Sequence, residues 1–280
     1  MKKDGIRYAR LDPEGNITCL VLSPVPREDR GRVTAALMDR CEQVGYLTSP
    51  EGPEAEARLE MMGGEFCGNA AMATAAWLTA GKGGEEASLR LEVSGAEKPV
   101  ACRVWREGKD WRASVEMPLP LGTEPFAAGE EQLDAVYLPG MVHLIRTGES
   151  LDPGRAEGLL RAAAEELREP AAGLLQWQEE RPGTAADGTE ISGRMIPLIW
   201  VRDSGTLVWE HACGSGTAAV ACRESARRQA SVRVRVQQPG GGLLTAETRW
   251  GCGGIEAITL SGRIRLGEPA FLEKEAGRKA

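Results

Sequence analysis

Residues 66–71 read FCGNAA, and residues 212–217 read ACGSGT. Both stretches place a cysteine before a glycine and a small polar residue, and both continue into an alanine-rich run of good helix formers. Each stretch predicts a turn in which a strand ends, a cysteine follows and a helix begins. The same turn built twice in one chain indicates a duplicated unit. The alternative is that a short pattern recurs by chance.

The sequence around both turns favours duplication, because it repeats one order of elements: strands, a helix, a strand, the cysteine-led helix and further strands. Four segments are predicted to be helices: one has helical apolar spacing, others are rich in good helix formers, and Asp152 followed by Pro153 is a typical helix start. The four segments are 27–45, with Gly45 as its stop, 67–84, 151–170 and 213–230. Alternating apolar residues between turn signals predict strands in the intervening segments, and the last ten residues read as a frayed tail.

This order predicts an α+β fold of two pseudo-symmetric domains that face each other, and not a solenoid. We expect each domain to be a β-sheet wrapped around a central helix, with an active site in the cleft between the domains. The predicted domains are residues 1–121 and 122–280, with the last strand and the tail crossing back to the first domain.

Composition narrows the class of function. Hydrophobic residues make up 42% of the 280 residues and charged residues 27%, which is typical of a globular chain with a full core. The net charge of −7 disfavours nucleic acids and anionic membranes as partners and suits an enzyme of small molecules. The first residues lack the apolar core of a signal peptide, and no apolar run is long enough to cross a bilayer. We expect a cytoplasmic protein.

The chain has seven cysteines and two histidines. An odd number of widely spaced cysteines in a long chain argues against a disulfide framework. No CxxC pair is present, so a zinc site would need scattered ligands. We therefore expect neither a metal nor a cofactor, and we expect most of the cysteines to be small core residues. Cys67 and Cys213 are exceptions because of the turns that follow them.

A cysteine at a helix start can do acid–base chemistry. The first amides of a helix have no internal partners and carry the positive end of its dipole, so they form a site for a carboxylate. The same field favours a thiolate, and we expect it to lower the pKa of each thiol towards neutrality. Two such helices that face each other would hold an α-carboxylate between two sulfurs. One thiolate would remove the α-proton and the opposite thiol would return one, which is racemisation by two bases.

The motifs also resemble a known family, the diaminopimelate epimerases and their cofactor-independent racemase relatives. The resemblance extends from residue 11 to about residue 260 and rests on four motifs in order. They are DPEGNITCLVL at 12–22, GGEFCGNAA at 63–71, GMVHL at 140–144 and EHACGSGTAAVA at 210–221.

The resemblance implies a role for each matching residue. Cys67 and Cys213 would be the acid/base pair, with His143 acting on one thiol and Glu210 on the other. The amides that hold the α-carboxylate would be those of Gly68, Asn69, Gly214 and Ser215, and Asn16 would lie close to the substrate. Outside the motifs, Glu210 reads as a helix-start acid, His143 as a core histidine and Asn16 as a turn residue.

Departures from the family's pattern concern the groups that read the far end of diaminopimelate. Met141 and Val142 stand where the family has asparagine and proline, and His211 replaces an arginine after Glu210. The asparagine before the first cysteine motif is replaced by Glu60 or by its neighbour Met61. A site without that arginine and those amides should not favour diaminopimelate.

The pattern GGEFCGNA with CGSGT is most similar to the histidine racemases that supply D-histidine for staphylopine-type metallophores. We therefore predict a racemase that interconverts L- and D-histidine, with Glu42, Glu60 and His211 as candidate contacts of the substrate. Family members are often dimers, and the resemblance alone implies a homodimer.

Three alternatives stay open. A diaminopimelate epimerase would keep the family's usual substrate. Proline racemases and hydroxyproline epimerases have the same fold and paired cysteines, but they favour histidine where Asn69 stands. A protein that is not an enzyme could use two facing thiols to bind a ligand or to sense oxidants.

Overall fold

The structure, a computed structural model, describes residues 5–180 and 190–273. It is a mixed α+β fold, rich in strands and with few helices in the described part, as the sequence predicts. The chain divides into two compact units. Unit 1 takes in the described residues of Met1–Ala113 and Arg263–Ala280, and unit 2 those of Ser114–Gly262. Among these residues, no helix is both long and apolar enough to span a bilayer.

Unit 1 is a sheet with one long helix against it and a shorter helix at its start. The strands are ordered β1-β2-β3-β4-β5-β6-β7, as in the chain. Their bounds are Gly5–Pro13 (β1), Thr18–Val21 (β2), Gln43–Thr48 (β3), Ala57–Met61 (β4), Glu86–Val93 (β5), Val100–Glu107 (β6) and Asp110–Glu116 (β7, which runs into unit 2). The helices are Arg27–Leu37 (α1), the 3₁₀ turn Met38–Arg40 (η1) and Gly68–Gly81 (α2).

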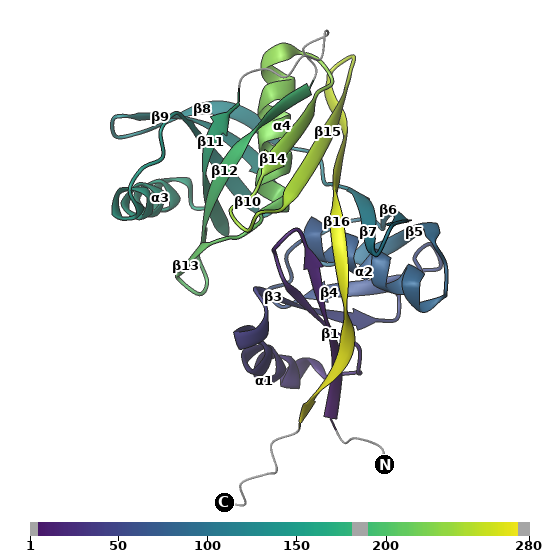
Figure 1. The fold of residues 1–280 in the computed structure, drawn as a ribbon. Coiled ribbons are helices and arrows are strands. Elements are labelled where there is room, and N and C mark those ends of the chain that lie inside the picture. Colours follow the sequence, from purple (N-terminus) through teal and green to yellow (C-terminus); the bar gives the residue numbers. More distant parts are fainter. Residues whose placement is uncertain (1–4, 181–189, 274–280) are drawn as a thin grey trace, which may run out of the picture. The chain divides into compact units, whose positions relative to one another are not determined.

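The helix α2 is the centre of unit 1. Its residues from Gly68 to Ala76 are all buried, and it contacts β1, β2, β5 and β6 (Figure 1). Most of these residues are alanine, which has the highest helix propensity and a side chain small enough for strands to approach closely. A helix that is buried on all sides needs no polar face, which is why this alanine-rich run can form the central helix of the unit.

Unit 2 contains the remaining elements. Its strands follow the order β16-β15-β14-β12-β11-β10-β9-β8, and β13 pairs with β12. The strand bounds are Gly122–Ala128 (β8), Glu131–Leu138 (β9), Met141–Thr147 (β10), Ala171–Glu179 (β11), Glu190–Val201 (β12), Thr206–Trp209 (β13), Arg233–Gln237 (β14), Leu243–Gly251 (β15) and Gly254–Glu273 (β16). The helices are Pro153–Leu167 (α3) and Gly214–Arg228 (α4).

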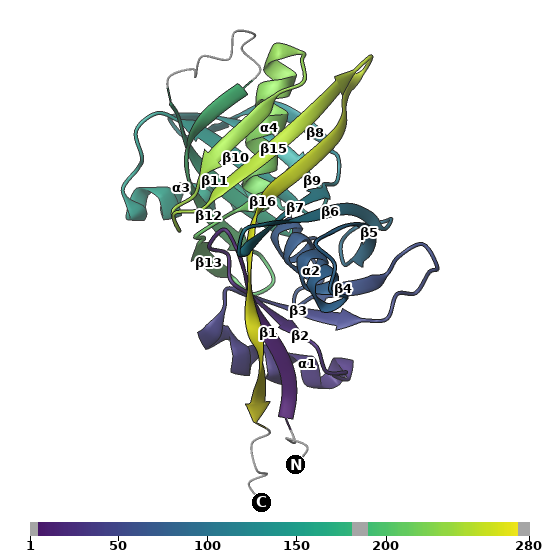
Figure 2. The ribbon, with the colours of Figure 1, turned by 45° about the vertical axis from the view of Figure 1, so that its right-hand side comes forward.

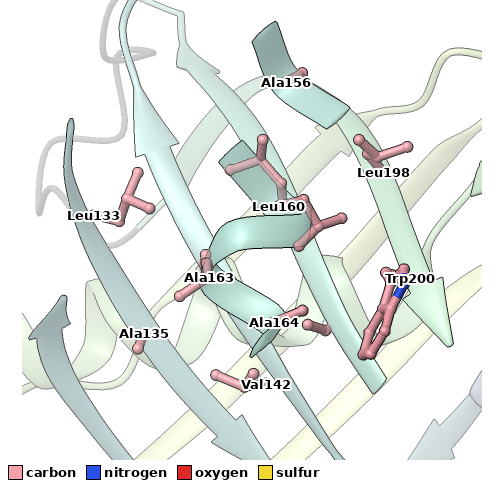
Figure 3. Close-up of a cluster of buried hydrophobic side chains, with 12 residues drawn as sticks. Leu133, Ala135, Val142, Ala156, Leu160, Ala163, Ala164, Leu198 and Trp200 are labelled. Atoms are coloured by element: carbon pink, nitrogen blue, oxygen red, sulfur yellow. The ribbon is translucent and has the colours of Figure 1, made fainter. Parts of the chain in front are cut away.

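Unit 2 packs one helix on each side of its sheet. Figure 2 shows α4 alongside β14 and β15, and α4 also contacts β8, β9 and β10. On the other side, Leu160, Ala163 and Ala164 of α3 pack against strand residues that include Leu198 and Trp200 (Figure 3). The predicted start of α3 is confirmed, because Asp152 accepts a hydrogen bond from the amide of Arg155 at 3.0 Å and Pro153 is the first helical residue.

The two units use the same succession of strand pairings. In unit 1, β2 and β3 pair in parallel, β3 and β4 antiparallel, and β4 and β5 in parallel. In unit 2, the corresponding steps are β10 with β11 in parallel, β11 with β12 antiparallel, and β12 with β14 in parallel. The long strand β16 belongs to both units, since it pairs with β15 through Ser261 and with β1 from Ile264 onwards.

Several elements differ from the sequence prediction. The helix expected over 27–45 ends at Leu37, and Gly45 lies inside β3 instead of ending the helix. That glycine is needed where strands pack, because a Cβ there would lie 2.7 Å from a methyl carbon of Leu59. The strands β8 and β11 were not expected, and the two predicted closing strands form the single strand β16, which includes Phe271 of the predicted frayed tail. The tail from residue 274 lies outside the described residues.

Candidate functional site

Both cysteine turns fold as the sequence predicts. Cys67 is the N-cap of α2, and its Sγ accepts a hydrogen bond from the amide of Ala70 at 3.4 Å. Cys213 is the N-cap of α4, and its Sγ accepts from the amide of Gly216 at 3.3 Å. Both cysteines have extended backbone angles, so each sulfur folds back over the first turn of its helix. The glycines Gly68 and Gly214 are the first helical residues.

In unit 1 the thiol of Cys67 has a side-chain amide as partner. Its Sγ donates to Oε1 of Gln43 at 3.1 Å. The amide of Gln43 is oriented by its other end, since Nε2 donates to Oγ1 of buried Thr18 at 2.8 Å. An amide oxygen only accepts hydrogen bonds, so this contact suits the protonated thiol.

Asn16 and Glu42 are hydrogen-bonded to each other in unit 1. Nδ2 of Asn16 donates to Oε2 of Glu42 at 3.2 Å, and the amide of Glu42 donates to the carbonyl of Ile17. Glu42 immediately precedes Gln43, whose side chain contacts Cys67. The hydrogen bonds therefore bring three of the predicted residues, Asn16, Glu42 and Cys67, to neighbouring segments of one unit.

Glu60 and Asn69 occupy different environments in unit 1. The carboxylate of Glu60 forms ion pairs with Arg30 at 2.6 Å, Arg27 at 3.1 Å and Arg58 at 3.3 Å. Burial raises the pKa of this carboxyl, but the three arginines outweigh burial and the net shift is downward. Asn69 is a buried residue of the first turn of α2. Glu60 is thus already neutralised by cations of the protein.

In unit 2 a buried glutamine fixes the backbone of Cys213. The Cys213 amide donates to Oε1 of Gln238 at 3.0 Å, and Nε2 of Gln238 donates to Oγ1 of Thr217 at 3.0 Å. Thr217 in turn donates to the carbonyl of Cys213 at 2.8 Å. This ring of hydrogen bonds ties the start of α4 to the turn after β14, which limits the positions that the sulfur can take.

His143 reaches Cys213 through a serine. On β10, Nε2 of His143 lies 2.9 Å from Oγ of Ser215, and this oxygen lies 3.5 Å from Sγ of Cys213. Nδ1 of His143 has no hydrogen-bond partner among the described residues. The ring fits because Gly173 faces it on β11, where a Cβ would lie 2.3 Å from Nδ1.

Electrostatics at Cys213 differ from the sequence expectation. We expected the helix dipole to lower the pKa of the thiol, but burial and then the charge and hydrogen bond of Glu210 raise it well above its usual value. The hydroxyl of Ser215 and the amide of Gly216 act in the opposite direction and are outweighed. Burial also lowers the pKa of His143 to about 3, so its imidazole is neutral at physiological pH.

The resemblance implies one thiol for His143 and another for Glu210. Within unit 2, the contacts of both groups converge on Cys213, directly for Glu210 and through Ser215 for His143. His211 is exposed, and its carbonyl accepts from the amide of Gly240 at 2.8 Å. Each unit therefore has a cysteine at a helix start. Backbone amides there can bind an anion, and polar groups contact the sulfur, which is the arrangement that general acid–base chemistry needs.

Sequence reasoning missed Gln43, Gln238 and Gly173. Gln43 falls in a segment that the sequence predicts to be helical, where no role for its side chain could be assigned. Gln238 lies in a proline- and glycine-rich turn, and Gly173 has no motif around it. No spacing signal marks these residues, because their partners are distant in sequence. Among the described residues, no group of three or more His, Cys, Asp or Glu side chains is placed to hold a metal ion.

Replacing Gly173 with alanine should displace the imidazole of His143, because the new Cβ would overlap Nδ1 and leave Nε2 unable to keep its contact with Ser215. We expect the free energy of unfolding to fall by about 1–3 kcal/mol, which is typical of an overpacked core. Urea denaturation measures this change.

Gly158→Ala is the matched control, since this exposed glycine of α3 has nothing within 4 Å of its ideal Cβ. It should be neutral or stabilising by up to about 1 kcal/mol. Equal stability of the Gly173→Ala and Gly158→Ala proteins would contradict the close fit of the imidazole against Gly173.

The family model and the curated relatives that match this chain are all histidine racemases. A family model described as the histidine racemase CntK N-terminal domain matches residues 5–268. A histidine racemase of Staphylococcus aureus is 25% identical over 263 residues, which cover 89% of this chain and 91% of that protein. One of Fusobacterium nucleatum is 25% identical over 276 residues, which cover 93% and 97%.

Solved structures of several proteins share this fold. A hydroxyproline epimerase from Agrobacterium vitis aligns with a TM-score of 0.69 at 16% identity, over 99% of this chain and 95% of that one. A predicted epimerase from Pseudomonas aeruginosa aligns with a TM-score of 0.67 at 19% identity, over 96% and 100%. The family match identifies an isomerase of the racemase and epimerase type. The chain belongs to the histidine racemase family, whose model spans nearly all of its described residues.

Proposed function

We propose that this protein is a cofactor-independent histidine racemase in which Cys67 and Cys213 are the acid/base pair. The observation that carries the proposal is the family match over residues 5–268, in a chain whose two motif cysteines are both N-caps of long helices. Both sequence relatives described above are named histidine racemases. The substrate is therefore L- or D-histidine, and the product is the other enantiomer.

The α-carboxylate of histidine binds at the two helix starts in this proposal. The amides of Gly68 and Asn69 in unit 1, and of Gly214 and Ser215 in unit 2, belong to the first turns of α2 and α4, where helix amides point towards a ligand. The N-terminal ends of the helix dipoles favour the carboxylate and the carbanion that forms next to it. No positively charged side chain is required for this part of the site.

The proposal requires the two helix starts to face each other in a cleft between pseudo-symmetric domains. The shared succession of parallel and antiparallel pairings around α2 and α4 supports a duplicated origin of the units. With one sulfur on each side of the substrate, proton removal and proton return occur on opposite faces of the α-carbon. The configuration then inverts without a change in the other substituents.

Proton transfer follows from this arrangement. The thiolate of one cysteine takes the α-proton and becomes a thiol, and the thiol of the other protonates the carbanion and becomes a thiolate. The two cysteines thus exchange protonation states in each turnover, and they must reset before the same enantiomer reacts again. Glu210 and the hydroxyl of Ser215 are the side-chain partners of Cys213, and Oε1 of Gln43 accepts a hydrogen bond from the thiol of Cys67.

Acidic and uncharged groups of the protein contact the imidazole side chain of the substrate. Glu42, held by Asn16, is the favoured partner, since Glu42 directly precedes the residue that contacts Cys67. Glu60 is less suited because three arginines already share its carboxylate. His211 stands where the diaminopimelate enzymes carry an arginine, and without that cation the site does not favour a second carboxylate.

We also propose a cytoplasmic homodimer that supplies D-histidine for the biosynthesis of an opine-type metallophore. All seven cysteines are free, which is typical of a reducing compartment. The dimer and the metallophore pathway rest on the family resemblance alone. Native mass spectrometry of the purified protein tests the dimer independently of activity.

Incubation with L-histidine in deuterated water, under reducing conditions and without added cofactor, tests the function. We expect D-histidine by chiral chromatography, and deuterium at the α-carbon by mass spectrometry, because protons that reach the thiols come from solvent. L-proline, trans-4-hydroxy-L-proline and diaminopimelate serve as comparison substrates.

Exchange into diaminopimelate in preference to histidine would overturn the interpretation of His211 and Met141. Exchange into proline or hydroxyproline alone would assign the chain to the activity of its structural relatives. The absence of exchange into every amino acid tested would leave the racemase proposal without support and favour a protein that only binds a ligand or senses oxidants.

A further inference from the structure

Three groups of unit 2 form a hydrogen-bonded chain that ends on the sulfur of Cys213. Nε2 of His143 lies 2.9 Å from Oγ of Ser215, and Oγ lies 3.5 Å from Sγ of Cys213. Ser215 is the second residue of α4, so its backbone amide lies at the helix start, and its hydroxyl is a separate group that can play a second role. The amide belongs to the proposed carboxylate site, and the hydroxyl points to the neighbouring cysteine and to β10.

The neutral state of His143 restricts what this chain can do. Burial lowers the pKa of His143 to about 3, so the ring brings no positive charge to the thiol at physiological pH. Nδ1 has no partner among the described residues and faces Gly173. A bare nitrogen is the less costly group to leave in this position, since a buried N–H without an acceptor is rarely tolerated. The tautomer with its proton on Nε2 therefore fits the site.

This tautomer gives the hydrogen bonds a direction. Nε2–H of His143 donates to Oγ of Ser215, and the hydroxyl of Ser215 is left to donate to Sγ of Cys213. In this direction the chain favours the negatively charged sulfur. It opposes burial and Glu210, both of which favour the neutral thiol. Among the described residues, Glu210 and, through Ser215, His143 are the titratable groups whose contacts to this sulfur the structure shows.

The partner of Cys67 acts in the opposite sense. Oε1 of Gln43 accepts from the thiol, and Nε2 of Gln43 is occupied by Thr18. Gln43 cannot donate to a thiolate in that orientation. The two thiols therefore differ in their polar partners: Cys67 has an amide oxygen, whereas Cys213 has a carboxylate and a hydroxyl that can donate.

We propose that Ser215 is a positioning residue whose hydroxyl, oriented by the neutral imidazole of His143, holds and stabilises the thiolate of Cys213. The inference rests on the proposed function, because the thiolate is the state that removes the α-proton. It assigns His143 to Cys213 as an indirect partner, and it adds a role for the Ser215 side chain to the role of its amide. These hydrogen bonds transfer no proton: one proton stays on Nε2 of His143 and the other stays on the hydroxyl oxygen of Ser215.

Ser215→Thr and Ser215→Val test the proposal as a matched pair, because the two side chains have nearly the same shape and only threonine keeps the hydroxyl. The Val variant should lose about fivefold to tenfold in kcat, the effect of one hydrogen bond, with little change in KM because the backbone amide is unchanged. The acid limb of its pH–rate profile should move to higher pH, since the thiolate has lost a donor. The Thr variant keeps a hydroxyl donor, so its kcat should exceed that of the Val variant and its acid limb should lie at lower pH than that of the Val variant.

Ser225→Ala is the control on the same helix. Ser225 is buried and donates to the carbonyl of Ala230 at 2.6 Å near the other end of α4. Its loss should lower stability and leave kcat and the pH profile unchanged. Urea denaturation of all variants separates a loss of folded protein from a loss of rate.

The absorbance of cysteine thiolates in the ultraviolet provides a readout that needs no turnover. Titration should form the thiolate at higher pH in the Val variant than in the Thr variant, and Cys213→Ser should abolish that difference. Equal pH profiles and equal titrations of the Val and Thr variants would overturn the role of Ser215 whether or not the wild type racemises histidine. A wild type without racemase activity that still shows the titration difference would overturn the proposed function alone.

Discussion

Replacing either Cys67 or Cys213 with serine is expected to abolish the racemisation of histidine. Serine has nearly the same shape as cysteine and can keep the N-cap hydrogen bond, but its hydroxyl is far too weak an acid to exchange protons with the α-carbon. We expect kcat to fall by about 10²–10⁴-fold for each single variant, the usual contribution of a general acid or base. Chiral chromatography of the product measures the loss.

The double variant sharpens this test. Because both thiols act on one substrate, Cys67→Ser combined with Cys213→Ser should be little slower than either single variant. Cys252→Ser, at an exposed cysteine outside both motifs, should match the wild type. Binding of histidine, measured by calorimetry, should persist in the single variants because the backbone amides of both helix starts remain. Full activity in either single variant would exclude the two-thiol mechanism.

Arg223→Met is expected to have the largest effect on stability. The guanidinium of Arg223 is buried on α4 and forms ion pairs with Asp134 of β9 at 2.5 Å and with Glu224 at 2.9 Å. Methionine would fill much of the space but would leave the buried carboxylate of Glu224 without this cation. Breaking a buried pair by removing one partner typically costs about 3–5 kcal/mol. Urea denaturation at neutral pH measures the change.

Arg235→Met provides the matched control, because Arg235 pairs with Glu190 at 3.3 Å on an exposed part of unit 2. Exposed ion pairs contribute about 0–1 kcal/mol, so this variant should unfold close to the wild type. If both variants lose the same stability, the buried ion pairs of Arg223 contribute no more than an exposed ion pair. Arg228, which reaches Glu224 at 3.4 Å, would then be the cation that compensates the carboxylate.

Much of the fold is encoded in local sequence. The alanine-rich runs after Cys67 and Cys213 form helices, and Asp152 with Pro153 begins a third, because propensity and capping act over a few neighbouring residues. The prediction was wrong where tertiary pairing overrides local signals. Gly45 has the character of a helix stop, yet it lies in a strand because its missing Cβ makes room for Leu59.

Parts of the candidate site could not be read from the sequence. Gln43 and Gln238 contact the two motif cysteines, but their partners are brought together only when distant strands pair with the elements around the helices. The pKa of the Cys213 thiol was also predicted wrongly from the sequence. A helix dipole is a local property, whereas the burial and the neighbouring Glu210 that raise its pKa depend on packing.

The sequence by itself determined the chemistry that this protein has available: two cysteines, each at the start of a helix, in motifs that identify the family. Those features depend on residues that are adjacent in the sequence, so they can be identified before the fold is known. The tertiary structure alone decided which groups surround each sulfur: an amide oxygen at Cys67, and at Cys213 a carboxylate and a hydroxyl that contacts a neutral imidazole. Burial and hydrogen-bond direction arise from contacts between distant segments, and these contacts set the protonation state of a thiol.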